Sequence, residues 1–422
     1  MGRLPLAILL VPAVFVIEVI LGGPRGIYDG VSIRFVLLGL ASAILLFALL
    51  LRGRITGPHL VPILSIAGFL VLNGIWIAVV PALTGTRFHW AVREPHAFIV
   101  LVPVVLALAV LARGELDRAV LRLQQVVVAA SLVLAVFQIS IWVVGTLAGN
   151  MQWVVSVVLN AIYSGASDDL KVGAAPDGFF RVFWISTLWC VLAFFWVPVA
   201  VRSPRLQWIF RGVLLLDLFV AYSRGIWLGL AVGVLVAGAA SVRRHALGRS
   251  LVRSALAGAL IAGALVGALW ASGELQRGAA RASSTVAGGE DESIAARLEQ
   301  AKYLLQLWYE HPLVGSGYGA YVHGHVRSQE VPYSYEHMPY ALLAKLGLAG
   351  VLASGIFFGA WAVTAWRARR FAPGQAGAFL GACAALLVAE MTNPLVLNFV
   401  SMSIFGCLLL QWASIAAPAE PA

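Results

Sequence analysis

The sequence predicts an all-α, polytopic integral membrane protein with about 12 transmembrane helices and one long loop outside the membrane. Of its 422 residues, 61% are hydrophobic and only 11% are charged. Soluble domains are about 45–50% apolar and about 25% charged, so this much apolar surface requires lipid as the solvent. The basic residues, in addition, gather in short gaps between the apolar runs.

Each predicted span is an apolar run of about 20 residues, the length that crosses a hydrocarbon core. In chain order the runs are 4–22, 33–51, 59–80, 96–113, 123–147, 179–201, 206–222, 225–242, 252–272, 338–366, 375–392 and 397–416. The first run resembles a signal peptide but lacks a small-x-small cleavage pattern. We therefore expect it to be an uncleaved first helix.

The orientation of the spans follows from the arginines, because short basic loops stay in the cytoplasm. One set of gaps holds Arg3, Arg52, Arg54, Arg113, Arg118, Arg122, Arg202, Arg205, Arg211, Arg243, Arg244, Arg249, Arg253, Arg367, Arg369 and Arg370. We expect these gaps, and with them both termini, to face the cytoplasm. The net charge of +10 then reflects membrane orientation, and no nucleic acid partner is predicted.

The opposite side holds the segments 23–32, 81–95, 148–178, 223–224, 273–337 and 393–396. Loops as long as 273–337 are usually functional in a compact protein. The predicted regions are therefore residues 1–272 with nine spans, the loop 273–337 with catalytic elements, and residues 338–422 with three spans.

The long loop is expected to contain an amphipathic helix that lies along the membrane surface or caps a cavity. Acidic residues at 290–292 favour a helix start. Apolar residues then follow at helical spacing on one face, namely Ile294, Leu298, Ala301, Leu305 and Trp308. His311-Pro312 should end the helix. Gly315, Gly317 and Gly319 follow, as either a flexible or a tightly turned stretch without the features of a phosphate loop.

Charged groups near a membrane are costly, so each is a functional hypothesis. Arg224 lies in a tight turn on the outer side, against the positive-inside bias, where it either reaches lipid headgroups or binds an anion. A guanidinium fork matches phosphate oxygens. Arg297, on the loop helix, is either solvated or a second clamp on the same anion.

Glu336 and His337 stand where the tenth predicted span begins. Either side chain can accept a proton, although both could also cap the helix at the interface. Arg181, at the outer start of the sixth span, is a weaker candidate for binding the substrate. A structural role is favoured for other polar residues and for the three cysteines, namely Asp29, Asp168, Asp169, His323, His325, Glu390, Asn393, Cys190, Cys383 and Cys407. No metal site and no cofactor is predicted.

Three blocks within residues 206–352 resemble the O-antigen ligase and polymerase family of bacterial envelopes. Ser223-Arg224-Gly225-Ile226-Trp227 is similar to a Ser/Thr-Arg-Gly-x-Trp block. Arg297, fifteen residues before Pro312-Leu313-Val314-Gly315-Ser316-Gly317, is similar to an Arg…Pro-Leu-x-Gly-x-Gly block. Glu336-His337…Gly347-Leu348-Ala349-Gly350 resembles a His-Asn…Gly-x-x-Gly block.

The last block departs from the family pattern, because His337 is followed by Met338 and precedes Gly347 by ten residues rather than eleven. Ungapped alignment places Glu336 on the histidine position, and a one-residue deletion restores His337. Either residue therefore remains a candidate base, with His337 preferred.

The resemblance implies a GT-C-like, inverting, metal-independent membrane glycosyltransferase of the inner membrane with a periplasmic active site. Its donor would be a polysaccharide on undecaprenyl pyrophosphate, and its acceptor, for a ligase, the lipid A-core sugar. Arg224, Arg297 and, as a helper, Arg181 would bind the pyrophosphate, while His337 or Glu336 would activate the acceptor hydroxyl.

Two alternatives stay open. An O-antigen or exopolysaccharide polymerase would use the same donor and chemistry with another acceptor. A lipid-linked glycan transporter would instead carry charged or helix-breaking residues near the midplane, together with inverted repeats. Few such residues are present, so the transporter is the less favoured alternative.

Overall fold

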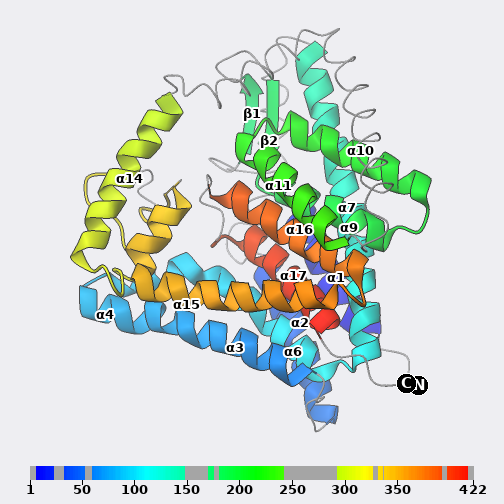
Figure 1. The fold of residues 1–422 in the computed structure, drawn as a ribbon, viewed down its shortest axis with the longest axis horizontal. Helices are drawn as coiled ribbons and strands as arrows, with labels where there is room; N and C mark the ends of the chain where they lie inside the picture. The colour runs from blue at the N-terminus through cyan, green and yellow to red at the C-terminus, as the bar shows by residue number, and fades with distance from the viewer. Residues whose placement is uncertain are drawn as a thin grey trace. The chain divides into compact units, whose positions relative to one another are not determined.

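Figure 1 shows a computed structural model of the chain, which describes residues 6–22, 33–52, 59–147, 170–174, 180–241, 292–326, 331–335, 337–391 and 397–416. The described elements are helices, apart from one antiparallel pair of strands. Among them, eight helices are long and apolar enough to cross a membrane. The chain is thus a mostly helical, multi-pass membrane protein, as its sequence predicts.

Every predicted span corresponds to described helical structure, except 252–272, which lies outside the described residues. The helices of the first half are α1 (Leu6–Leu21), α2 (Ile33–Arg52), α3 (Leu60–Gly74), η2 (Ile75–Val79), α4 (Val80–Thr84), α5 (Phe88–Arg93), η3 (Glu94–Val100), α6 (Leu101–Val110) and α7 (Arg113–Leu147). Those of the second half are α9 (Thr187–Ala200), α10 (Pro204–Val220), α11 (Arg224–Ser241), α14 (Glu292–Glu310), α15 (Met338–Ala368), α16 (Pro373–Glu390) and α17 (Phe399–Ala416). A total of twelve spans and a GT-C-like arrangement stay predictions.

The structure differs from the predicted boundaries where apolar composition alone is ambiguous. The predicted span 179–201 begins as a strand, β2 (Phe180–Trp184), which pairs with β1 (Leu170–Ala174), and its helix starts only at Thr187. Burial alternates along β2, which is the period of a strand. The predicted outer gap 81–95 is largely helical, in α4 and α5, and α7 already begins at Arg113 rather than at residue 123.

The described helices form two compact units. Unit 1 comprises Met1–Ile44, Asp117–Gly289 and Ala368–Leu386, and unit 2 comprises Leu45–Leu116, Glu290–Arg367 and Leu387–Ala422. Each unit therefore assembles segments that are far apart in the sequence. The predicted division at residues 272 and 337 stays a prediction.

Helix α9 is the core of unit 1, because its side chains from Thr187 to Val197 are buried on every face. A helix that is apolar all round belongs in an interior. Two hydrogen bonds join α9 to α7: Ser131 Oγ donates to the Trp189 carbonyl at 3.3 Å, and the Gln138 amide donates to Thr187 Oγ1 at 3.2 Å.

In unit 2, α15 runs antiparallel to α3, and the two helices lie side by side in Figure 1. Trp361 Nε1 donates to Ser65 Oγ at 2.8 Å, while Phe357 meets Phe69 edge to face further along the pair. Helix α17 packs against α6 and η3, and its side chains from Phe399 to Cys407 are almost all buried.

Two irregularities interrupt the helices of unit 2. After α3 the chain widens into the π-helical turn η2, a rare feature that frequently occurs at functional sites. Helix α15 is broken at Gly347, whose φ of 60° and ψ of −175° are not helical. Both irregularities free backbone N–H and C=O groups, which need hydrogen-bond partners within the protein.

Candidate functional site

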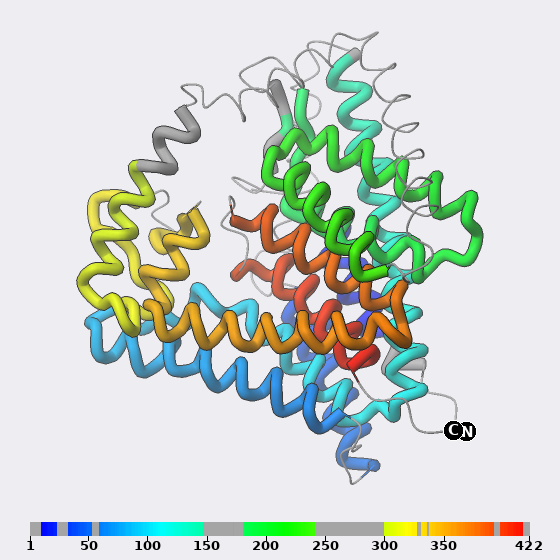
Figure 2. The backbone as a smooth tube through the Cα atoms, viewed as in Figure 1, coloured from blue at the N-terminus to red at the C-terminus, as the bar shows by residue number. Residues whose placement is uncertain are grey.

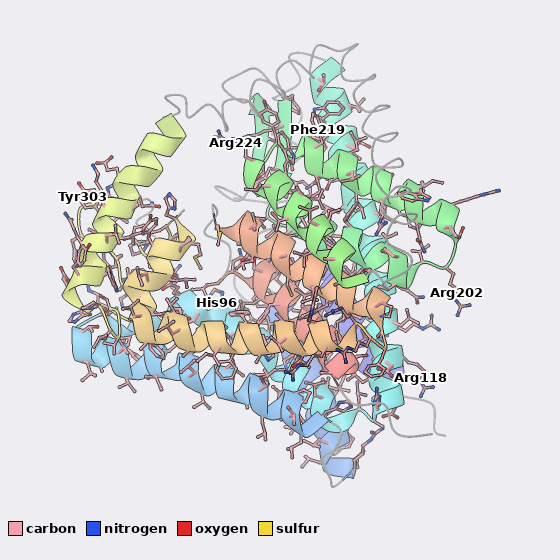
Figure 3. All side chains as sticks on the ribbon, viewed as in Figure 1. His96, Arg118, Arg202, Phe219, Arg224 and Tyr303 are labelled. Atoms are coloured by element: carbon pink, nitrogen blue, oxygen red, sulfur yellow. The ribbon has the colours of Figure 1, made fainter. Side chains whose placement is uncertain are left out.

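Arg224 is the first residue of α11, directly after a sharp reversal of the chain. The reversal passes through the buried Tyr222, whose φ of 51° is unusual for a residue that is not glycine. Trp227 stacks on Phe219 with ring centroids 5.7 Å apart, and its Nε1 donates to the Leu218 carbonyl at 2.9 Å. Arg224 is thereby held at a helix N-terminus, where the helix dipole favours anions. Figure 3 labels Arg224 and Phe219.

Arg181 lies on β2, at the same end of unit 1. Phe180 and Val182 are buried and pack with Val220 on the last turn of α10, four residues before Arg224. Because strand side chains alternate, the half-buried Arg181 projects from the opposite face of β2. The structure therefore brings two of the predicted arginines to one end of unit 1.

The other two described candidates belong to unit 2. Arg297 lies on α14, whereas His337 immediately precedes α15. The backbone N–H of His337 donates to Gln300 Oε1 at 3.2 Å. Gln300 is buried and follows Arg297 by three residues, which is about one helical turn. The structure thus brings His337 to α14 within about a turn of Arg297, whereas Glu336 lies outside the described residues.

A small hydrophobic core fixes α14 against the start of α15. It consists of Leu304, Tyr335, Ala341 and Ala344, with Leu307, Trp308 and Tyr321 packed around it. The buried face of α14 therefore includes the predicted Ala301 and Trp308, but it is centred on Leu304 rather than Leu305. The helix ends at Glu310, before His311-Pro312, as predicted.

The glycine-rich segment after α14 is tightly turned. Gly315, Gly317 and Gly319 all have positive φ, between 68° and 85°. A side chain at Gly317 would approach Pro81 Cγ to 2.6 Å, and one at Gly319 would collide with the backbone of Trp90. Only glycine fits at these three positions, because they combine left-handed backbone with close packing.

This segment, here called the glycine loop (residues 312–319), satisfies the backbone groups that the two helix irregularities release. At the break of α15, Ser316 N donates to the Ala344 carbonyl, Gly317 N to the Lys345 carbonyl and Leu348 N to the Pro312 carbonyl, at 2.9–3.0 Å. At the π-helical turn, Tyr318 N donates to the Trp76 carbonyl at 3.0 Å and Trp76 Nε1 to the Val314 carbonyl at 2.7 Å. The second and third motif blocks are therefore joined backbone to backbone.

A buried ion pair, which the sequence reasoning missed, lies beside the glycine loop. Lys345 Nζ on α15 contacts Glu94 Oε1 at the start of η3, and both side chains are less than one-tenth exposed. Glu94 Oε2 also accepts the Gly319 N–H at 2.6 Å, and Lys345 Nζ also donates to the Tyr333 carbonyl at 2.8 Å. In the sequence, the signal that could have revealed this pair is a single lysine, Lys345, within an apolar helix.

Two tyrosines line this ion pair. The rings of Tyr333 and Tyr335 lie 5.9 and 5.6 Å from Lys345 Nζ, within the range of a cation–π contact. Burial, followed by the nearby Glu94 carboxylate, raises the pKa of both phenols to about 12. Neither tyrosine is therefore ionised near neutral pH, so neither supplies an anionic base there.

Two of the weaker candidates, both histidines, contact aromatic rings. The His323 ring lies 4.8 Å from that of Tyr321, and the His325 ring stacks on Tyr303 at 4.5 Å. Glu390 is the last residue of α16. Asn393, Asp29, Asp168 and Asp169 lie outside the described residues. Within the described part of the chain, no group of three His, Cys, Asp or Glu side chains could hold a metal ion.

The described helices make the chain a multi-pass membrane protein, and its family match suggests a membrane glycosyltransferase-like enzyme. Residues 209–353 match the family described as O-antigen ligase, and this match supports assignment of the chain to the O-antigen ligase/polymerase family. The matched third of the chain contains all three motif blocks and confirms the resemblance seen in the sequence. No curated protein and no solved structure matches the chain.

Proposed function

We propose that the chain is an O-antigen ligase, an inverting and metal-independent glycosyltransferase of the bacterial inner membrane. It would move O-antigen polysaccharide from undecaprenyl pyrophosphate to the lipid A-core sugar at the periplasmic face, within a GT-C-like bundle of about 12 spans. The observation that carries the proposal is the family match over 209–353, which includes Arg224, Arg297 and His337.

In the proposed reaction, an acceptor hydroxyl oxygen attacks the anomeric carbon of the donor sugar. The bond from that carbon to the pyrophosphate oxygen breaks, and its electron pair leaves with the pyrophosphate. Arg224 and Arg297, helped by Arg181, neutralise the developing charge. His337 takes the hydroxyl proton. The Gln300 bridge supports pairing His337 with Arg297, and their convergence with Arg224 stays a prediction.

The test is transfer by purified protein from lipid-linked glycan to lipid A-core, with and without a chelator. We expect product in both conditions. Arg224→Ala and Arg297→Ala should each abolish transfer while the protein still folds. Arg→Lys at either position should also be damaging, because an ammonium lacks the bidentate fork. Full activity in either alanine variant, or loss of product on chelation, would contradict the mechanism.

The polymerase is the second candidate, because the family match does not distinguish the two activities. A deletion strain separates the two. Loss of a ligase leaves the core bare while lipid-linked polymer accumulates. Loss of a polymerase leaves cores that carry a single repeat unit.

A further inference from the structure

We propose that the buried Glu94–Lys345 ion pair is a positioning device that holds residues 331–335, and through them the candidate base His337, in place. The proposal rests on the proposed function, because it assigns to the pair an effect on transfer that acts through His337. It concerns unit 2 alone, where every contact involved is described.

The pair is the point where four separate chain segments meet. Glu94 begins η3 and Lys345 lies on α15, while the two additional hydrogen bonds reach Gly319 in the glycine loop and the carbonyl of Tyr333. Each charged group therefore binds its partner and the backbone of one further segment. These further partners are the backbone groups of Gly319 and Tyr333. The pair therefore fixes the position of the backbone rather than the rotamer of a neighbouring side chain.

Stability alone is a poor explanation for such a pair. Removing two charges from water is energetically costly, and well-packed apolar residues often stabilise an interior as well or better. The best-attested benefit of buried polar groups is a defined geometry. Here the geometry concerns Tyr333, four residues before His337 in the sequence.

A hydrogen bond holds each of these two residues. Lys345 binds the Tyr333 carbonyl, and Gln300 accepts the His337 N–H at 3.2 Å. Between them, the Tyr335 hydroxyl accepts the Val322 N–H at 2.7 Å. Without the lysine, the first attachment is lost and His337 depends on the remaining ones. A displacement of about 1 Å can lower a rate by about 100-fold.

The experiment compares Glu94→Gln, Lys345→Met and the double variant in purified protein. Each single variant leaves one buried charge uncompensated and should lower the unfolding temperature, whereas the double variant should recover much of it. Transfer should not recover: in the double variant we expect kcat to fall by about 10- to 100-fold with little change in KM for the donor.

A second comparison tests whether the effect passes through His337. In a His337→Ala background, the double variant should cost little further activity, because groups that act as a unit are not additive. The matched control is Glu18–Arg34, a buried pair in unit 1 joined at 2.8 Å. Its neutral replacement, Glu18→Gln with Arg34→Met, should leave kcat within about twofold of the wild type.

The outcomes separate the two proposals. If the wild type does not transfer glycan at all, the proposed function fails. If the wild type is active and the double variant keeps its kcat, or if the double variant lowers the rate as much without His337 as with it, the ion pair has only a structural role and the inference is overturned.

Discussion

Gln300 shows how a single polar side chain can join two candidate site residues. It is buried on α14, one turn beyond Arg297, and its Oε1 accepts the backbone N–H of His337. A buried amide of this kind has to be hydrogen-bonded, and a buried N–H that loses its acceptor costs about 1–3 kcal/mol. The identity of residue 300 is therefore expected to matter for transfer as well as for folding.

We predict that Gln300→Leu lowers kcat by about tenfold or more, since the N–H of His337 loses its acceptor and the segment shifts. Gln300→Glu keeps an acceptor oxygen and should retain more activity than the leucine variant. The measurement is steady-state transfer by purified protein.

The control is Gln306→Leu, which changes the same residue type at an exposed position of the same helix. It should behave like the wild type. Equal activity of Gln300→Leu and Gln306→Leu would show that the Gln300 bridge has no part in the reaction.

At the residue scale, the sequence predicts the candidates that motifs mark and misses those that only packing reveals. Arg224, Arg297 and His337 stand in recognisable blocks, although their roles stay predictions. Glu94 and Lys345 are 251 residues apart. Nothing local to either residue indicates its partner, because the pairing depends on how η3 and α15 pack.

At the scale of elements, the glycine loop acts as a connector for two broken helices. Gly315 is the critical position, because a side chain there would collide with the backbone of Lys345 and Gly347. We predict that Gly315→Ala lowers the unfolding free energy by more than the 1–3 kcal/mol typical of left-handed strain alone. Thermal unfolding in detergent provides the measurement.

Gly324→Ala separates strain from collision. Gly324 also has a positive φ, of 86°, but nothing lies within 4 Å of a side chain added there. It should therefore show the strain alone. A Gly315→Ala variant no less stable than Gly324→Ala would contradict the close docking of the loop onto α15.

Element prediction succeeds where apolar length decides the outcome and fails where two structures share a composition. Helices such as α2 and α17 match their predicted ranges closely. The strand Phe180–Trp184 is as apolar as a helix, and only its alternating burial distinguishes it. The tight course of the glycine loop depends on contacts with Pro81 and Trp90, which sequence spacing does not reveal.

For the whole molecule, the arginine pattern makes a prediction about sidedness. α14 should face the periplasm, and the α15–α16 connection the cytoplasm. We predict that Lys302→Cys reacts with a membrane-impermeant maleimide when only the outer membrane has been opened, whereas Arg370→Cys reacts only after the inner membrane is permeabilised. Both positions are exposed.

The protein without an added cysteine is the control and should label weakly, since Cys190 and Cys407 are buried and Cys383 is partly buried. The opposite pattern of labelling would show that the protein has the reverse orientation in the membrane, and it would contradict a periplasmic site. The membrane class itself is readily predicted, because it depends on composition. The interleaving of units 1 and 2 is not, because it depends on contacts between distant segments.

The π-helical turn Ile75–Val79 holds one residue more than a regular turn would, and it contains the Trp76 carbonyl that accepts the Tyr318 N–H. Deleting one residue there would give a more regular helix and, by local criteria, a better one. Yet all that follows would rotate by about 100° about the helix axis, carrying Pro81 away from Gly317. In this part of the chain, a more regular helix would misalign Pro81 with the glycine loop that packs against it.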